Sequence, residues 1–201
     1  MSDDLTGRID RLESIEAIKK LKHLYMNYCD LGYPPDKLGP LFADDAVWTG
    51  KHYGHHQGRP AIQAFFGGIS PQIVFAAHLA MNFIIDVDGD YGTGKWRILM
   101  PCTKLEGGKR VSRWILGDYD EEYVRFNGVW LFKKIDFLAN YNVRFDESWS
   151  ESTVCAPFEL IWGMAAKLNR TLAWTWYDQM NGRSWHFSAM LRLTRYVSTR
   201  R

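Results

Sequence analysis

The fold class of this chain is decided by residues 86–130, DVDGDYGTGKWRILMPCTKLEGGKRVSRWILGDYDEEYVRFNGVW. Three dipeptides, Asp88-Gly89, Gly107-Gly108 and Asn127-Gly128, can supply the positive φ angles that tight hairpin turns require. The residues around them follow a period of two and are rich in β-branched and aromatic types, which is typical of strands. The expected strands cover residues near 73–87, 93–105, 110–125 and 129–144. Joined by three hairpins, they predict an antiparallel meander.

Helical patterns precede the meander. From Leu5 to Tyr28 apolar residues recur at steps of three and four, which predicts one face of an amphipathic helix, and Gly32 followed by Pro34 ends it. Further elements are expected as a short helix over 35–42, short strands over 46–48 and 53–57, and a helix between Gly58 and Gly68. Because these helices precede the sheet, they must cover one face of it, and the fold class is α+β.

A second helical pattern follows Trp149. Apolar residues from Phe158 to Trp176 share one face, with Pro157 at the first turn. About 50 residues with one apolar stripe cannot form a core of their own. We therefore expect one α+β domain over 1–149 and a helical extension over 150–201, whose segment 153–197 packs on that domain, over a pocket mouth or on a neighbouring subunit.

The composition excludes several functional classes. The chain has 201 residues with a net charge of +2, so nucleic acid is a poor default partner. Its cysteines, Cys29, Cys102 and Cys155, have no CxxC spacing, and no apolar run is long enough to span a membrane. We expect a cytoplasmic protein without a nucleic-acid or membrane partner. With 9 Trp, 10 Tyr and 11 Phe, the chain is rich in aromatic residues, which must line a core, a partner surface or a pocket.

The sequence predicts no metal and no organic cofactor. His52, His55 and His56 cluster, but no carboxylate or thiolate stands nearby at a matching spacing. We expect these histidines in a loop near a pocket rim. No glycine-rich phosphate loop and no Gly-x-Ser-x-Gly motif occurs, so nucleotide binding and acyl transfer have no support.

Asp30 and His78 are the first candidates for chemistry. Asp30 follows a long helix, where the macrodipole disfavours a negative charge, although a role in the following turn would also explain it. His78 lies in an expected apolar strand and shares its face with Ala80 and Asn82, so that face has room for a ligand. A hydrogen-bonded core histidine is the alternative.

The last expected strand offers a possible pocket wall. Trp130 and Phe132 begin one face, and Asn140, Asn142 and Arg144 continue it if no bulge intervenes. A face that runs from aromatic to amide to guanidinium resembles a pocket wall with a polar end. Arg144 could equally form an ion pair at the surface.

Several segments together resemble the SnoaL-like enzymes of the nuclear transport factor 2-like superfamily over about residues 8–148. The segments are IEAIKKL at 15–21 running to Tyr25 and Asp30, FADDAVW at 42–48, GRPAI at 58–62, His78 with Asn82 and Asp88-Gly89-Asp90, GDYDEEYVR at 117–125, and GVW at 128–130. The resemblance implies a cone-shaped barrel, in which a curved antiparallel sheet wraps around the N-terminal helices. It also implies a homo-oligomer, a trimer or dimer.

Within the superfamily the chain is most similar to the cofactor-free lyases, such as the bile-acid dehydratase, hexachlorocyclohexane dehydrochlorinase, scytalone dehydratase and diarylpropane formaldehyde-lyase types. The resemblance implies that Asp30 orients His78, which moves the substrate proton, and that Tyr25 and Arg144 assist. It also implies a pocket role for Trp48. We further expect the substrate to contact Tyr28, Asn82, Trp114, Asn140 and Asn142. Where the bile-acid enzyme has another carboxylate, this chain has Met100.

These features predict a cofactor-independent lyase that acts on a small hydrophobic, aromatic substrate such as a lignin-derived diarylpropane, by dehydration or by release of formaldehyde. Two alternatives remain open. One is a steroid or polyketide isomerase or cyclase. The other is a non-catalytic binding subunit of the kind found in ring-hydroxylating dioxygenases.

Overall fold

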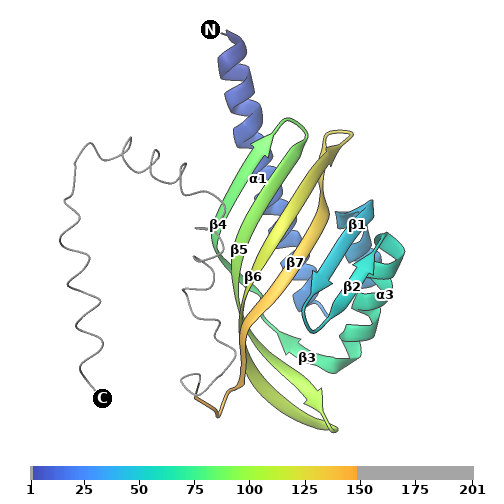
Figure 1. Cartoon of the computed structure of the whole chain (residues 1–201). Helices are drawn as coiled ribbons and strands as arrows, with labels where there is room; N and C mark the ends of the chain where they lie inside the picture. The colour runs from blue at the N-terminus through green and yellow to red at the C-terminus, as the bar shows by residue number, and fades with distance from the viewer. Residues whose placement is uncertain (1, 149–201) are drawn as a thin grey trace, which may run out of the picture. The chain divides into compact units, whose positions relative to one another are not determined.

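A computed structural model of the chain describes residues 2–148 (Figure 1), all of which lie in the first of its two units, Met1–Cys155. The helices are α1 (Ser2–Asp30), α2 (Pro35–Leu38) and α3 (Arg59–Ile69), with 3-10 turns at Gly39–Leu41 and Ser70–Gln72. The strands are β1 (Phe42–Gly50), β2 (Gly54–Gln57), β3 (Ile73–Ala76), β4 (Leu79–Asp88), β5 (Tyr91–Glu106), β6 (Lys109–Phe126) and β7 (Val129–Arg144). The predicted extension over 150–201 lies outside the described residues.

The strands form one curved, open sheet in the order β2-β1-β7-β6-β5-β3, and β4 also pairs with β5. Strands β4 to β7 are successive antiparallel neighbours, so the predicted meander is confirmed. Its turns contain the expected left-handed residues, among them Gly89 at φ +57°, Gly107 at +56° and Asn127 at +49°. The chain has the predicted α+β class, but the sheet does not close into a barrel.

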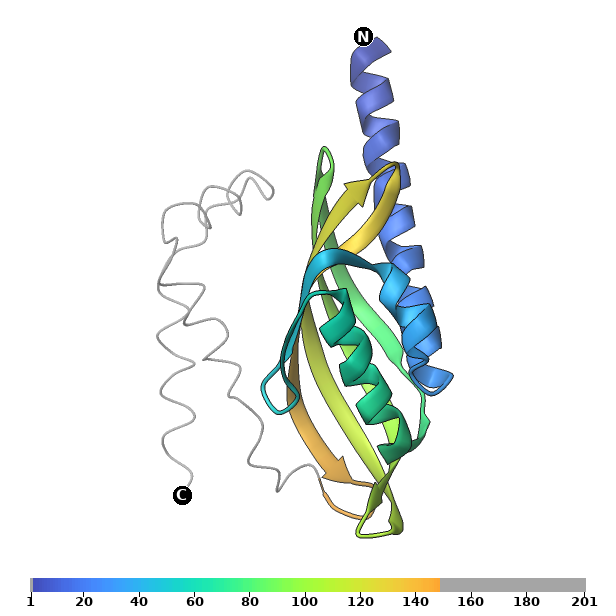
Figure 2. The ribbon, with the colours of Figure 1, turned by 90° about the vertical axis from the view of Figure 1, so that its right-hand side faces the viewer.

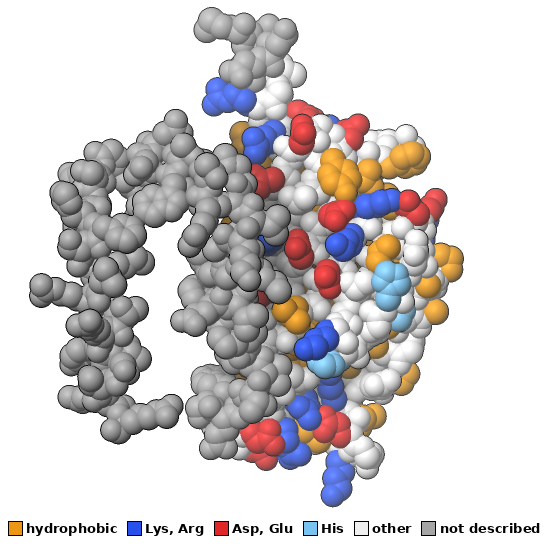
Figure 3. All heavy atoms as spheres, in the orientation of Figure 1, with side chains coloured by type: hydrophobic (Ala, Val, Ile, Leu, Met, Phe, Trp, Pro, Cys, Tyr) orange, Lys and Arg blue, Asp and Glu red, His pale blue; other side chains and the backbone are white. Residues whose placement is uncertain are grey.

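The helices cover the concave face of the sheet. Helices α1 and α3 lie on the same side of it (Figure 2). Between helices and sheet lies a continuous apolar core that includes Ile18 and Tyr25 of α1, Phe66 of α3 and Phe132 of β7, all buried. On the other face of the sheet, acidic and basic side chains lie side by side (Figure 3). Arg97 of β5 and Asp118 of β6, which are paired across the two strands, form an ion pair.

The structure differs from the predicted strands in two ways that matter for the site. The segment expected as one strand over 73–87 is broken at Ala77 and His78, between β3 and β4. On β7 two extra residues interrupt the pairing with β6, Lys133 between Phe132 and Lys134, and Asn140 between Ala139 and Tyr141. Each such bulge inserts one unpaired residue and thereby changes which face the following side chains occupy.

Among residues 2–148, no helix is both long and apolar enough to cross a membrane.

Candidate active site

A cavity lies between the helices and the concave face of the sheet. Its empty space, counted together with open solvent at its mouth, is about 470 Å³. Its lining is aromatic and aliphatic, with His78 as the one titratable nitrogen base among the lining residues: Tyr25, Tyr33, Trp48, Tyr53, Phe65, Phe66, Ile69, Ile73, His78, Ile98, Met100, Ile115, Tyr119 and Phe137. An apolar cavity with a few polar groups is the usual form of a small-molecule site.

Asp30 and His78 form a hydrogen-bonded pair at the edge of this cavity. His78 Nδ1 lies 2.6 Å from Asp30 Oδ1, and the backbone N–H of His78 donates to the same oxygen at 2.9 Å. The break between β3 and β4 frees this N–H from strand pairing, so that the carboxylate at the end of α1 can accept it. Because a carboxylate only accepts, Nδ1 carries the hydrogen, and neutral His78 has its free electron pair on Nε2.

Tyr33 contacts that free nitrogen. Its hydroxyl oxygen lies 3.2 Å from His78 Nε2 and donates to it when the imidazole is neutral. Tyr33 follows Gly32 in the turn after α1 and has a left-handed φ of +59°, which is uncommon for an aromatic residue. Burial raises the pKa of its hydroxyl well above the ordinary value, so it stays a donor at neutral pH. The sequence analysis did not single out Tyr33, because only its position in the turn brings it to His78.

A second set of hydroxyls lies deeper in the cavity. Trp48 Nε1 donates to the Tyr25 hydroxyl at 3.2 Å. Tyr119 lines the same cavity, and burial raises the pKa of both the Tyr25 and the Tyr119 phenol well above the usual value. Tyr25 and Trp48 therefore both line the cavity, and the roles that the resemblance implies for them stay predictions. Tyr119 was missed, although alternation from Ile115 along β6 identifies its face.

Other predicted contacts do not line the cavity. Asn82 lies at a bulge in β4 with φ +38° and is exposed, because the pairing shifts between Met81 and Ile84. Tyr28 is partly buried beside Lys37 on another side of α1. Trp114 lies opposite Val143 on the face of β6 that Ile115 does not share, and it stacks on Phe145. None of these three residues is part of the cavity lining, because the helix or strand that carries each of them places it elsewhere.

The bulge at Asn140 also separates the residues predicted to share one face of β7. Asn140 donates to Asp118 on the outer face of the sheet. Asn142 lies opposite Ile115, a cavity residue, and Arg144 lies opposite Arg113. Since residues directly opposite in an antiparallel pair share a face, Asn142 and Arg144 are on the concave side but beyond the cavity.

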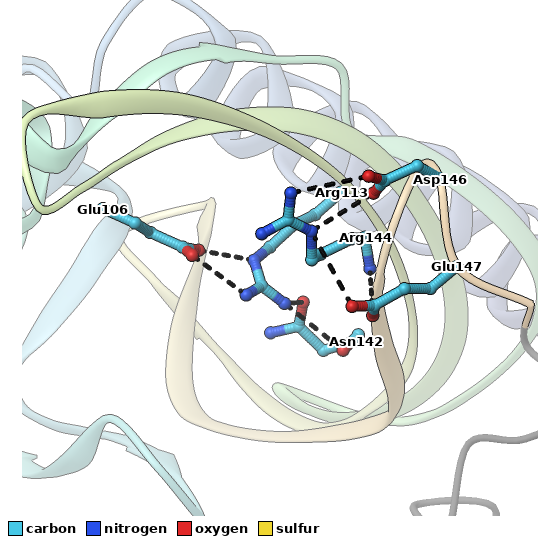
Figure 4. A network of polar contacts seen from close by, with 6 residues as sticks. All are labelled: Glu106, Arg113, Asn142, Arg144, Asp146 and Glu147. Carbon is cyan, nitrogen blue, oxygen red and sulfur yellow. Dashed lines mark hydrogen bonds and ion pairs between the residues drawn. The ribbon is translucent and has the colours of Figure 1, made fainter.

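Arg144 belongs to a polar network at this end of the sheet (Figure 4). Its guanidinium pairs with Asp146 at 3.2 Å and with Glu147 at 3.7 Å. Neighbouring Arg113 binds Glu106 through two nitrogens and donates to Asn142. The Arg144 guanidinium, predicted to assist catalysis, is thus engaged by two carboxylates and does not line the cavity.

Of the three clustered histidines, His55 and His56 lie in strand β2 rather than in the expected loop, and His56 packs behind the cavity wall. His56 stacks on Phe65 with ring centroids 4.1 Å apart, and its Nε2 hydrogen-bonds to the Tyr53 carbonyl. Phe65 and Tyr53 both line the cavity, so His56 supports the wall from behind. In the described part of the chain, no three His, Cys, Asp or Glu side chains gather in a group that could hold a metal ion.

A curved open sheet wrapped around helices, with an Asp–His pair at the edge of an apolar cavity, defines an NTF2-like α+β protein. The chain belongs to the SnoaL-like domain family, which it matches over residues 10–136. This confirms the family and superfamily that the sequence segments predicted.

The proteins similar to this chain include enzymes named as dehydrochlorinases and a candidate dehydratase. The gamma-hexachlorocyclohexane dehydrochlorinase of Sphingobium indicum is 29% identical over 140 residues, which are 66% of this chain and 85% of that protein. The structure of a type 3 hexachlorocyclohexane dehydrochlorinase from Novosphingobium barchaimii has a TM-score of 0.62 at 27% identity, covering 70% of this chain and 96% of that one. A candidate scytalone dehydratase from Novosphingobium aromaticivorans shares the fold, with a TM-score of 0.61 at 21% identity over 74% of this chain and 94% of that one.

Proposed function

We propose that the chain is a lyase in which His78 removes a proton from an uncharged aromatic or alicyclic substrate and a leaving group is expelled without a cofactor. The observation that carries this proposal is the orientation of His78. Asp30 holds Nδ1–H, so the basic Nε2 is directed to the cavity lining at Tyr33. The names of the relatives, a dehydrochlorinase and a candidate dehydratase, support an elimination.

The proton transfer follows from the charges of the pair. When Nε2 accepts the substrate proton, the imidazole becomes a cation, and the Asp30 carboxylate at 2.6 Å stabilises it. The electron pair of the broken C–H bond forms a double bond and displaces the leaving group, which departs with the bonding electrons. The phenols of Tyr33, Tyr25 and Tyr119 can donate hydrogen bonds to an oxygen or halogen that gains negative charge.

The lining restricts the substrate. None of the 14 cavity residues is an Asp, Glu, Lys or Arg, so a charged substrate would lose its hydration without a partner ion. The aromatic walls favour a substrate with rings. A diarylpropane with a hydroxymethyl group fits this chemistry: His78 would take the O–H proton, formaldehyde would leave as the C–C bond breaks, and hydroxide would depart from the adjacent carbon.

The test is a substrate screen with matched variants. We expect the wild-type protein to convert at least one compound among diarylpropane diols, hexachlorocyclohexanes, steroids and polyketide fragments, with loss of water, formaldehyde or halide detected by mass spectrometry. His78→Ala should abolish this turnover, whereas His23→Ala, at an exposed site on α1, should not. Isomerisation without loss of any fragment would favour the isomerase alternative. Full activity of His78→Ala would show that His78 is not the base.

A further inference from the structure

An ion pair lies buried behind the cavity wall. Lys22 of α1 and Glu121 of β6 have no exposed side-chain surface, and their charged groups are in contact. Glu121 also accepts the hydroxyl hydrogen of Tyr123, which in turn accepts the indole N–H of Trp96 at 2.9 Å. Glu121 therefore acts only as an acceptor, as a carboxylate does, and Lys22 is its ammonium partner.

The positive end of this pair is directed to the cavity. Lys22 Nζ lies 3.4 Å from the centroid of the Tyr119 ring and 5.1 Å from that of Tyr25. Both rings line the cavity, whereas Tyr123, which binds the carboxylate, does not. The ammonium therefore lies against two rings that both line the cavity.

Stability alone does not account for the pair. Removing two charges from water is costly, and replacement of a buried ion pair by uncharged residues of similar size often leaves stability unchanged or raises it. A fixed charge in an apolar interior has a second effect, however, because its field is weakly screened there. This field would stabilise negative charge that develops in the neighbouring cavity, and no reorientation of solvent would be needed.

We propose that Lys22 is a positioning residue whose ammonium, acting through the rings of Tyr119 and Tyr25, stabilises the negative charge that develops on the substrate and its leaving group. This inference rests on the proposed function. As His78 takes the proton, the electron pair left behind moves toward the leaving group, so the substrate passes from neutral to partly anionic. Lys22 therefore favours the transition state over the uncharged substrate.

A spectroscopic probe tests this inference without knowledge of the substrate. The probe is 4-nitrophenol, whose neutral and anionic forms differ in absorbance. Lys22→Met/Glu121→Gln removes both charges, keeps the volumes similar and leaves an oxygen that can accept from Tyr123. We expect this variant to bind the phenolate about 10-fold more weakly, which raises the pKa of the bound probe by about one unit, while the neutral phenol binds as in the wild type.

The matched control is Lys19→Met/Glu16→Gln. This pair lies one turn earlier on the same helix, with the charged groups 2.5 Å apart, and Lys19 contacts Phe83, which does not line the cavity. The control should bind both probe forms as the wild type does. Circular dichroism verifies each fold; should the double variant not fold, Glu121→Gln alone must give the same shift, because Lys22 without a counter-charge favours its neutral form.

The outcomes separate the two proposals. Equal phenolate affinity in the wild type and in the folded variant would overturn the role of Lys22 and leave the proposed function intact. If 4-nitrophenol binds none of the proteins, the cavity is not a site for small aromatic molecules, and the proposed function fails with the inference. A selective loss of phenolate affinity, absent in the control, supports both.

Discussion

Asp30 holds His78 at two points, the backbone N–H and the ring N–H. The two contacts have different electrostatic requirements. The backbone N–H needs an acceptor oxygen, which an amide also provides, whereas stabilisation of the imidazolium needs the negative charge. A conservative substitution therefore separates the structural role of Asp30 from its role in proton transfer.

We expect Asp30→Asn to fold and to lose activity by about 10²–10⁴-fold, because the amide oxygen can still accept from the backbone but carries no charge to stabilise the imidazolium. Tyr25→Phe should cost less, since Tyr33 and Tyr119 remain as donors. Rates on the substrate found in the screen measure both effects. Asp36→Asn, at an exposed carboxylate of α2, is the control and should retain full activity.

At the scale of elements, the bulge at Lys133 decides which face of β7 covers the core. Before it, Trp130 and Phe132 are buried; after it, Ile135 and Phe137 are buried. If Lys133 were paired like its neighbours and the strand alternated regularly through it, Lys134 would point inward and Ile135 and Phe137 outward. The cavity would then lose Phe137 from its lining.

Deleting Lys133 leaves Phe132, Lys134 and Ile135 in regular alternation, so Ile135 and Phe137 stay on the core face, and this variant should fold and melt only moderately below the wild type. Thermal denaturation followed by circular dichroism measures this. Lys133→Ala keeps the residue count and breaks only the exposed ion pair with Asp45, so its melting temperature should stay close to that of the wild type. A deletion variant that does not fold would show that the local bend at the bulge, and not only the facing of Ile135 and Phe137, is needed for the sheet.

These elements also explain which parts could be predicted from the sequence. Turn dipeptides and periodicity act locally, so the meander, the helices and the α+β class follow from them. The Asp30–His78 pair was predicted by resemblance and is in contact. The bulges at Lys133 and Asn140 depend on pairing with β6, which one strand's own pattern does not encode, and for this reason the faces of Asn140, Asn142 and Arg144 were not predictable. Tyr33 reaches His78 only through the turn after α1.

At the scale of the whole molecule, the buried phenols link stability to alkaline pH. Burial raises the pKa of Tyr25, Tyr33, Tyr119 and Tyr123 well above the ordinary value. In the unfolded state a tyrosine hydroxyl has a pKa of about 10. Above that pH the unfolded state binds fewer protons than the folded state, so the free energy of unfolding falls as pH rises.

Urea unfolding between pH 8 and pH 11, at roughly half-unit steps around the tyrosine pKa, should show this fall begin near pH 10. Cys29, whose pKa burial also raises, acts in the same direction, whereas Lys22, whose pKa burial lowers, opposes it. Tyr33→Phe removes one phenol and should reduce the slope above pH 10 by up to about 1.4 kcal/mol per pH unit. An identical slope in the variant would mean that Tyr33 ionises equally easily in both states.

The double attachment of His78 has a consequence for protein engineering and for divergence within the family. The groups that fix the base are at the end of α1 and at the break between β3 and β4, whereas Ile98, Met100 and Ile115, which line the cavity from the sheet, belong to β5 and β6. On the proposed function, substrate preference can therefore change through the sheet wall while Asp30 and His78 stay unchanged. A library confined to those three positions should sample new specificities and keep the proposed catalytic pair.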